Sequence, residues 1–532
     1  MPISIFNDVI GPVMRGPSSS HCAAGLRIGR LARDLMGGQI KKVLVEYDRD
    51  GSLATTHESQ GSDMGLCGGL MGWDAADARV PDSVQRIQDA GIDMSIVIDD
   101  FHDDHPNTYR LTLTHAEARH RLKAVSTGGG MIEVTEIDGF PLSLLGDYQE
   151  TLIFLDGHGE TLKQHILDHC DPDEILLHDR DHGQLLQIKA QFFVDAKHIT
   201  SFCHSHSIQS ITPLNPVLPI RSHRAVQVPF STCEDMLRYD AGQNLPLWEL
   251  AVQYESQRGN LSHEEVLAHM IEIVHISRAS IKQGIDGTVH ENRILGHQSG
   301  QFKTHMETSG LLEAGVLNRI VLYVTALMEV KSAMGVIVAA PTAGACAALP
   351  GACIAASDTM GLTDEETAKA LLAGGLIGAL VATKSTFAAE VCGCQAECGV
   401  ASGMAAAALV SLIKGTTPQA ISATSMAFQN CLGMICDPVA NRVEVPCLGK
   451  NVMAATNALA CANMALAGYD PVIPLDEVID TMDMVGRSIP RELRCTALGG
   501  LSITPTSRAI EDRLKSCNKK LTDRSMQDFL GT

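Results

Sequence analysis

The chain of 532 residues is 45% hydrophobic but only 4% aromatic, which predicts roughly two to four domains with cores of small and aliphatic side chains. Its 41 basic and 62 acidic side chains give a net charge of −21. This charge repels phosphate groups, so we expect neither nucleic acid nor a membrane surface as a partner.

The sequence has no pattern of export or membrane insertion. Its start, MPISIFNDVIGPVM, lacks the basic residues and long apolar run of a signal peptide. The most apolar stretch, 370–383, is shorter than the roughly 20 residues that cross a bilayer, and we interpret it as a buried helix. Sixteen cysteines without an export signal indicate a reducing compartment, so we expect a cytoplasmic protein with free thiols.

Residues 1–147 predict an α+β domain. Strand-like runs are KKVLVEYD, MSIVI, YRLTLTH and MIEVTEI, and helices are expected after the serine-rich segment 16–22 and near 62–90. Residues 148–222 alternate again, with a strand (YQETLIFLDG), a helix (ETLKQHILDH), two strands around a turn, the short segment DAKHITSFCHS and a final strand (SIQSITPL). This βαββαβ order resembles a small ligand-sensing domain of the ACT type, which we expect to regulate the protein or mediate assembly.

Residues 230–532 predict an all-α domain. Strand patterns are scarce after the linker PLNPVLPIRSHR, and long helical patterns follow. TDEETAKALLAGGLIGALVA begins with a capping box, Thr363 with Glu366, and is then apolar on every face, which is typical of a helix inside a bundle. The expected architecture is therefore multidomain, with an α+β domain, an ACT-like domain and a C-terminal all-α catalytic domain.

Several cysteines lie in the helical half of the chain. EVCGCQAECGVASGM (390–404) holds three of them, which is compatible with a metal site, a redox pair or small residues in a packed core. Cys436 precedes Asp437-Pro438 and Cys447 follows Pro446, so both lie at breaks between helices, where a turn can direct a thiolate. Two buried loop cysteines are the alternative interpretation. Because no paired CxxC spacing occurs, a structural zinc site is not expected.

Ordered motifs along nearly the whole chain resemble the iron–sulfur-dependent L-serine dehydratase family. GPSSSHC (16–22) is similar to the family's GPSSSHT, and HPNT (105–108) and GGGMIEVTE (128–136) also match. Further matching segments are MGVIVAAPTAGACAALPG, GCQAECGVASGMAAAA, CDPV, VEVPCLGKN and GGLSITPT (499–506). The resemblance implies a hydro-lyase that eliminates water from a small-molecule hydroxy acid.

The resemblance also implies a [4Fe–4S] cluster with three cysteine ligands and one open iron. The family's ligand positions fall on Cys394, Cys436 and Cys447. Cys392 and Cys398 stand where the family has Gly and Val, so we expect both to be replaceable. Three thiolates leave one iron free to act as a Lewis acid on the leaving hydroxyl.

In the implied reaction a base removes the Cα proton while the hydroxyl leaves. His21 is the expected base or proton relay, because an imidazole titrates near neutral pH. Ser18, Ser19 and Ser20 are expected to donate hydrogen bonds to a carboxylate. The alternative interpretation of His21 is a helix-capping or structural histidine.

Several positions depart from the family's motifs. The histidine of its GHGTD or GHHTD motif becomes Gln60 in GSLATTHESQGSD. Its TGGDA-type loop becomes GHQSGQFK (296–303), which keeps Lys303, an expected catalytic residue, but has Gln301 in place of a carboxylate. A glutamate before the GGL motif is replaced by Cys495.

The substitutions near the cluster motifs add cations. KSTFAAE (384–390) replaces the family's NASISGA, and ANRVEVP replaces AGLVEVP, which introduces Lys384 and Arg442. Because carboxylates that could pair with an ammonium are lost and cations are gained, we expect a substrate without an amino group and with a second carboxylate. The expected substrate-binding residues are Lys384, Ser385, Arg442 and Gln60.

The expected reaction converts (S)-2-(hydroxymethyl)glutarate into 2-methyleneglutarate, as fused-chain members of the extended family do in nicotinate degradation. One alternative is an ordinary L-serine dehydratase, which forms pyruvate and ammonia. A second is a non-catalytic iron–sulfur sensor protein. A homo-oligomer is expected, because Gly-rich helical domains of this kind often pair.

Overall fold

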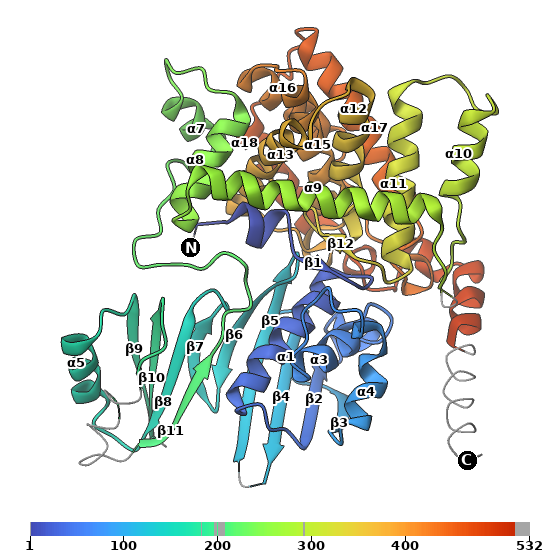
Figure 1. The fold of residues 1–532 in the computed structure, drawn as a ribbon. Helices are drawn as coiled ribbons and strands as arrows, with labels where there is room; N and C mark the ends of the chain where they lie inside the picture. Colours follow the sequence, from blue (N-terminus) through green and yellow to red (C-terminus); the bar gives the residue numbers. More distant parts are fainter. Residues whose placement is uncertain are drawn as a thin grey trace.

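The computed structural model describes residues 2–515, except 117, 182, 196–198, 200–207 and 291–292. Figure 1 shows two sheets with their helices in the N-terminal part and a helical region above them. This confirms the predicted division into a mixed α/β half and a helical half. The segment DAKHITSFCHS of the predicted βαββαβ unit lies largely outside the described residues.

The larger sheet has six strands in the order β3-β2-β4-β5-β6-β7. β2 and β3 run parallel, and the other neighbours are antiparallel. Buried residues alternate along the strands, as Val43 and Val45 do in β2, because one face packs against helices. The elements of this part are β2 Lys42–Asp48, β3 Asp93–Asp99, β4 Thr108–His115, β5 Ala118–Gly128, β6 Met131–Ile137, β7 Phe140–Leu144, α1 Ala24–Leu35, α2 Leu53–Thr56, α3 Ser62–Leu70 and α4 Ser83–Asp89.

The smaller sheet is antiparallel and has the strand order β11-β8-β10-β9. Numbered within this unit, the order is fourth, first, third, second, which is the order of a ferredoxin-like βαββαβ fold. The elements described are β8 Gln149–Leu155, α5 Gly159–His169, β9 Glu174–Arg180, β10 Gly183–Ala190 and β11 Ile208–Leu214. The ACT-type role of this unit stays a prediction.

A buried carboxyl group lies in this smaller sheet. Oε2 of Glu150 accepts a 2.7 Å hydrogen bond from Nε2 of Gln187, while Oε1 has no hydrogen-bond partner. Burial raises the pKa of Glu150 to about 8, because the charged form loses its hydration. The folded protein therefore holds a proton here that the unfolded chain releases above its ordinary pKa.

We expect Glu150→Gln to weaken the pH dependence of folding stability. A raised folded-state pKa makes the free energy of unfolding fall as pH rises between the ordinary pKa and about 8, by up to about 1.4 kcal/mol per pH unit. Thermal unfolding measured at about pH 5 and about pH 8 checks this. The fall between the two should be smaller in Glu150→Gln than in the wild type, whereas Glu160→Gln, on the exposed side of α5, should leave it unchanged.

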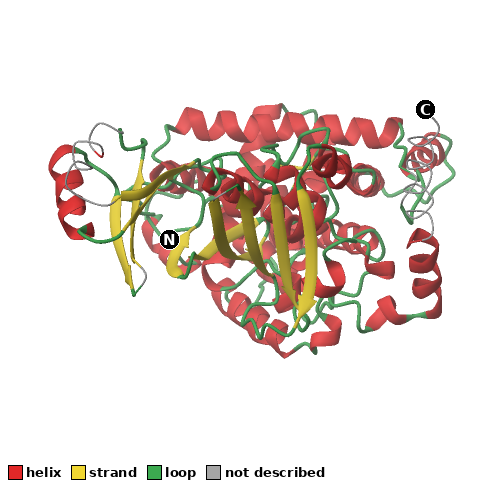
Figure 2. Ribbon diagram, turned by 90° about the horizontal axis from the view of Figure 1, so that it is seen from below, coloured by secondary structure: helices red, strands yellow, loops and turns green. Residues whose placement is uncertain are grey.

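The C-terminal region is built from helices, which Figure 2 shows behind the sheets. The capping box predicted from Thr363 and Glu366 is confirmed at the start of α13. The helices are α7 Cys233–Tyr239, α8 Leu247–Gly259, α9 His263–Asp286, α10 Ser299–Glu307, α11 Val316–Ser332, α12 Ala348–Met360, α13 Asp364–Lys384, α14 Ala389–Cys392, α15 Cys398–Leu412, α16 Thr417–Gln429, α17 Cys447–Leu466 and α18 Leu475–Ser488.

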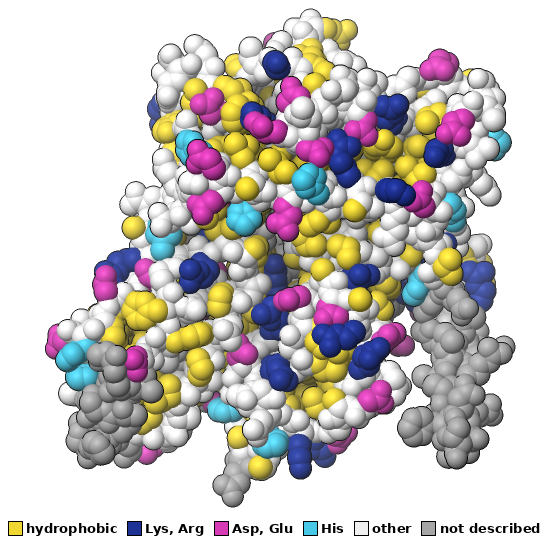
Figure 3. All heavy atoms as spheres, viewed as in Figure 1, with side chains coloured by type: hydrophobic (Ala, Val, Ile, Leu, Met, Phe, Trp, Pro, Cys, Tyr) yellow, Lys and Arg dark blue, Asp and Glu magenta, His cyan; other side chains and the backbone are white. Residues whose placement is uncertain are grey.

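Two segments are long and apolar enough to cross a membrane, Asp364–Lys384 and Cys394–Leu412. Within the most apolar window of each, 78% and 89% of the residues are buried inside the protein. Both therefore have the burial of core helices, as expected for 370–383. On the face shown in Figure 3, acidic and basic side chains are intermixed over both halves of the chain.

The N-terminal segment joins the two halves. β1 (Val13–Met14) pairs with β12 (Ile337–Val338) of the helical region. The backbone N–H of Ile5 donates a 2.7 Å hydrogen bond to the buried carboxyl of Glu255 in α8. These contacts position the following serine-rich segment, 16–22, against the cysteine-bearing helices.

Candidate active site

The three predicted cluster ligands lie buried in the helical region, with Cys394, Cys436 and Cys447 only 3%, 6% and 7% exposed. Cys394 begins a single 3₁₀ turn, and Cys447 is the first residue of α17. Gly393 has φ 70°, and a Cβ there would lie 2.8 Å from the carbonyl oxygen of Met434, so this turn requires glycine. The thiols are thus held by turns and helix starts.

Neighbouring groups favour the thiolate form of Cys394. The thiol of Cys398 donates a hydrogen bond to it and, together with the ammonium of Lys450, lowers the pKa of Cys394 to about 7 despite burial. Burial lowers the pKa of Lys450, but the negative charges of Cys394 and Cys436 outweigh this effect and hold the pKa above its ordinary value. Cys398 therefore contacts a predicted ligand directly.

A second lysine, Lys331, is buried among these groups. Lys331, in α11, is fully buried, and its Nζ donates a hydrogen bond to the carbonyl oxygen of Val443. Burial raises the pKa of Cys447 to about 12, and the charge of Lys331 opposes that rise. A buried cation next to thiols is costly unless negative charge compensates it.

The chemistry of these residues fits an iron–sulfur cluster. Among the described residues, no group of three or more His, Cys, Asp or Glu side chains could hold one ion. A cluster distributes its thiolate ligands over several irons, so its cysteines need not converge on one point. Buried thiols held at turns, with lysines beside them to balance their charge, fit the chemistry of such a group.

His21 is fully buried and hydrogen-bonded through both ring nitrogens. Nδ1 lies 3.0 Å from Oγ of Ser18, and Nε2 lies 2.8 Å from Oγ1 of Thr56. Because Thr56 donates its own hydrogen to the carbonyl oxygen of Ser52 at 2.7 Å, we assign the ring proton to Nε2 and the lone pair to Nδ1. Burial lowers the pKa of His21 to about 3, so the ring is neutral near pH 7.

A carboxyl group faces this histidine. Oε1 of Glu390, in α14, lies 3.8 Å from Nδ1 of His21. Burial raises the pKa of Glu390, and hydrogen-bonding groups of Asn107 and Ser20 partly counteract the rise. Glu390 precedes Cys394 by four residues, so the histidine segment and the first cysteine segment meet here.

The segment after β12 links the two halves a second time. The backbone N–H of Ala343 donates a 3.1 Å hydrogen bond to Oγ of Ser19. Oγ1 of the preceding Thr342 donates a 2.6 Å hydrogen bond to Oε1 of Glu397. Burial raises the pKa of Glu397 to about 8, and the negative charge of Cys394 adds to the rise. One serine of the predicted carboxylate-binding set is therefore linked to the thiol site.

Gln60 reaches the same region from the other side. Its Nε2 lies 3.0 Å from Oδ1 of Asn441 and 3.5 Å from Sγ of Cys495. The thiol of Cys495 also contacts Cys436, and its backbone N–H donates a 2.9 Å hydrogen bond to the carbonyl oxygen of Cys436. The two substituted positions, 60 and 495, are thus in contact beside a predicted ligand.

Lys384 and Ser385 face α18 instead of the thiols. Nζ of Lys384 lies 3.0 Å from a carboxylate oxygen of Asp480 and 3.8 Å from Asp476. Oγ of Ser385 donates a 2.8 Å hydrogen bond to Asp483. The charge expected to attract a second substrate carboxylate is therefore already paired with aspartates.

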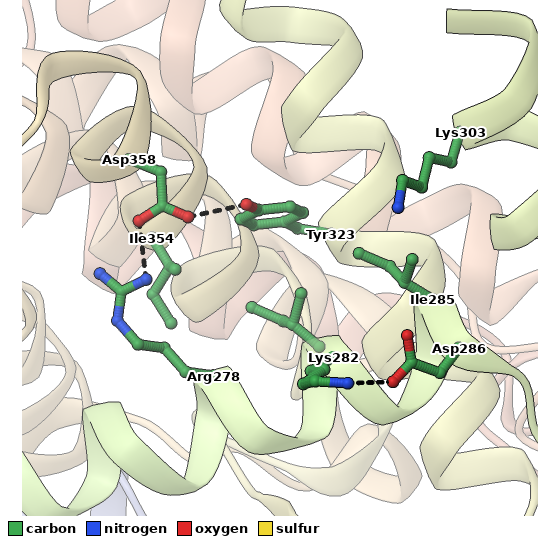
Figure 4. A pocket seen from close by; sticks show the side chains of 9 residues that line it. Arg278, Lys282, Ile285, Asp286, Lys303, Tyr323, Ile354 and Asp358 are labelled. Carbon is green, nitrogen blue, oxygen red and sulfur yellow. Dashed lines mark hydrogen bonds and ion pairs between the residues drawn. The ribbon is translucent and has the colours of Figure 1, made fainter. Parts of the chain in front are cut away.

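Lys303 lines a separate surface cavity of about 330 Å³ between α9, α10, α11 and α12. Figure 4 shows it opposite Lys282, which pairs with Asp286, and near Tyr323. The Lys303 side chain is about half exposed, and its nearest carboxylate is Glu307, at 3.9 Å. Within the described part of the chain, Lys303 has no ion pair or hydrogen bond with the thiol site, whereas the serine, histidine and glutamine segments are linked to that site by the contacts above.

Sequence reasoning missed four charged residues of this site, Glu390, Glu397, Lys331 and Lys450. A signal was present for two of them, because the glutamates are the only charged residues in the stretch 390–404. A charge inside an otherwise apolar, cysteine-rich stretch is costly to bury and indicates a functional or structural partner. Lys331 and Lys450 lie on amphipathic helices, where a lysine usually indicates a solvent-exposed position.

Comparison with known proteins supports a shared ancestry for much of the chain. Residues 242–502 match the family described as serine dehydratase alpha chain. The probable L-serine dehydratase alpha chain of Bacillus subtilis is 34% identical over 285 residues, which cover 54% of this chain and 95% of that protein. The L-serine dehydratase alpha chain of Peptoniphilus asaccharolyticus is 31% identical over 281 residues, covering 53% and 96%. A probable beta chain from Bacillus subtilis is 41% identical over 150 residues, covering 28% and 67%.

Proposed function

Because the chain belongs to the iron–sulfur-type L-serine dehydratase alpha-chain family, we propose that it converts L-serine into pyruvate and ammonia. Family membership makes the protein a dehydratase, and L-serine is our choice of substrate within that class. This choice favours L-serine dehydration, which is the alternative expected from the sequence, over the dehydration of (S)-2-(hydroxymethyl)glutarate. It agrees with the names of the relatives.

The observation that carries the choice is the pairing of charges at the site. Lys384, the cation expected to bind a second carboxylate, is paired with Asp480 and Asp476. Two buried carboxyl groups, Glu390 and Glu397, lie beside the histidine and the first cysteine instead. Buried carboxyl groups suit a substrate that carries an ammonium group.

In this proposal Cys394, Cys436 and Cys447 hold a [4Fe–4S] cluster. When bound, the cluster supplies an open iron that acts as a Lewis acid toward the leaving hydroxyl. Lys450 balances the charge of the thiolates, and Cys398 donates a hydrogen bond to Cys394. Ser19 and the backbone around Ala343 hold the two halves together at the substrate's position.

The proton from Cα is proposed to end on His21. Its Nδ1 lone pair accepts the hydrogen of Ser18, so the Ser18 hydroxyl can relay a proton from the substrate to the ring. Thr56 holds Nε2–H and thereby fixes the orientation and tautomer of the imidazole. Loss of the hydroxyl completes the elimination, and the resulting enamine hydrolyses to pyruvate and ammonia.

The test is turnover by protein purified without oxygen. Pyruvate formed from L-serine is measured beside iron and acid-labile sulfide content. Pyruvate formation by the iron-loaded protein would support the proposal. Loss of turnover of L-serine and of related β-hydroxy acids alike would favour a non-catalytic iron–sulfur sensor, and an active but iron-free protein would contradict the cluster.

A second candidate, (S)-2-(hydroxymethyl)glutarate dehydration in nicotinate degradation, is favoured by Arg442. This residue follows Asn441, which accepts a hydrogen bond from Gln60, and burial lowers the pKa of its guanidinium. Glu444 and Glu58 lie near enough to oppose that effect. A partly buried arginine beside the site is a potential partner for a second carboxylate.

We expect Arg442→Leu to separate the two candidates. If the substrate is a dicarboxylate, its kcat/KM should fall by about 10- to 100-fold, because a charged hydrogen-bond partner is lost, while L-serine is affected little. If L-serine is the substrate, the variant should keep most of its activity with it. Steady-state kinetics with both compounds decides, and equal losses with both would contradict a role of Arg442 in carboxylate binding.

Three further features remain proposals beside the substrate. They are a cytoplasmic location, assembly into a homo-oligomer and a regulatory, ACT-like role for residues 148–222. The strand order β11-β8-β10-β9 supports the ACT-like role, because it is the order of a ferredoxin-like unit. Measurement of the molecular mass of the purified protein in solution tests the assembly into a homo-oligomer.

A further inference from the structure

Two buried polar side chains have incomplete hydrogen bonding: Glu390, which lies beside His21, and Asn107, which lies near Glu390. Glu390 is 8% exposed and Asn107 is fully buried. Oε2 of Glu390 and both polar atoms of the Asn107 side chain have no hydrogen-bond partner. Buried polar atoms in folded proteins are nearly always paired, so two neighbouring side chains whose hydrogen bonds fall short of good geometry leave acceptors for a bound polar group.

The two side chains are close to each other. The amide of Asn107 and the hydroxyl of Ser20 lie near enough to the carboxyl of Glu390 to stabilise its charged form. Asn107 belongs to the segment HPNT just before β4, whereas Glu390 belongs to α14 of the helical half. The unpaired atoms are therefore brought together by the contact of the two halves.

The titratable groups described around Glu390 do not balance the negative charge of its carboxylate form. The ion-pair partner of Glu390 among the described residues is His21, and this ring is neutral near pH 7. The charge of Glu390 also raises the pKa of two other groups, Tyr109 in β4 and Glu397, and both of these are acids that cannot supply a positive charge. A cation supplied by a ligand would balance a carboxylate here.

We propose that Glu390 and Asn107 form the subsite that binds the ammonium group of the substrate. The inference deepens the proposed function and rests on it, because L-serine carries such a group. An ammonium has one positive charge and three donor hydrogens. Oε2 of Glu390, Oδ1 of Asn107 and Oγ of Ser20 supply three acceptors for them. A second carboxylate placed here would be repelled by Glu390.

The position of this subsite also agrees with the proposed removal of the Cα proton by His21 and Ser18. Glu390 stands four residues before Cys394, and Oε1 lies 3.8 Å from Nδ1 of His21. An amino group held at Glu390 would bring the adjacent Cα toward His21 and Ser18. Ammonium binding and proton removal would thus be served by neighbouring side chains of one site.

The test compares two ligands that cannot be dehydrated. L-Alanine has the ammonium and carboxylate groups of L-serine, and propionate lacks the ammonium. Their inhibition constants, with calorimetric binding as a second readout, are measured on the anaerobically prepared holoenzyme and on Glu390→Gln. We expect the wild type to prefer L-alanine and Glu390→Gln to reduce that preference by at least about tenfold, with KM for L-serine rising more than kcat falls. Glu477→Gln, exposed on α18, should match the wild type.

An unchanged preference in Glu390→Gln would overturn the proposal, even if the wild type dehydrates L-serine. Absence of L-serine turnover by the wild type would instead refute the proposed function, and the ligand comparison would still decide the subsite. If Glu390→Gln does not fold, Asn107→Ala is measured in the same way. A reduced preference for L-alanine in that variant supports the subsite, and an unchanged one overturns it.

Discussion

Single replacement of Cys394, Cys436 or Cys447 by serine is expected to abolish dehydratase activity and to remove bound iron. A hydroxyl is a much poorer iron ligand than a thiolate, so each change removes a ligand outright. The loss should therefore exceed the roughly 10- to 100-fold that replacing a partner outside the ligand set typically costs. Iron, acid-labile sulfide and pyruvate formation from L-serine are measured on protein purified without oxygen.

Cys392→Ala is the matched control for these variants. Cys392 is as buried as the ligands, but its thiol faces Asp483 at 3.8 Å. We expect the variant to keep its iron and to retain activity within roughly threefold, because a small buried side chain is exchanged for another. Loss of iron from Cys392→Ala, or full activity in any of the three serine variants, would contradict the assignment of ligands.

The helical half could be predicted from the sequence because its signals are local. The capping box of Thr363 and Glu366 involves residues three apart, and the apolar helix that follows has no polar face to expose. The described strands and first helix of residues 148–222 likewise follow from a short, regular alternation of strand and helix patterns. The predicted helical segment, which begins with this capping box and ends near residue 382, agrees with the observed helix Asp364–Lys384.

The charges of the candidate site could be predicted only in part, because their partners are distant in sequence. Lys384 was interpreted as a substrate ligand, yet its partner Asp480 lies 96 residues away on α18. Glu390 faces His21 across more than half the chain, so its role as a neighbour of the histidine is visible only after the halves meet. The resemblance of motifs identified the thiols and the serine segment, whereas the fold determines which charges remain for a substrate.

Replacement of Asn451 by leucine is expected to lower the free energy of unfolding by about 4 kcal/mol or more, from about 1–3 kcal/mol for each buried polar group left unpaired. Asn451, in α17, is fully buried one turn after Cys447. Its Oδ1 accepts hydrogen bonds from the backbone N–H groups of Ala347 and Ala348 at 3.2 and 3.1 Å. Its Nδ2 donates to the carbonyl oxygen of Gly344 at 2.7 Å and to that of Cys447 at 2.9 Å.

The same change should also impair the active site. The segment that Asn451 holds carries Thr342, which bonds to Glu397, and Ala343, which bonds to Ser19. Denaturant unfolding and iron content are measured beside Asn463→Leu, the same substitution on the exposed face of α17, which should change stability by less than about 0.5 kcal/mol. If Asn451→Leu unfolded at the same denaturant concentration as Asn463→Leu, the hydrogen bonds of this one side chain would not be what joins the 340–348 segment to the cysteine helix. Retention of iron by a destabilised Asn451→Leu would show instead that the thiols keep their positions without that segment.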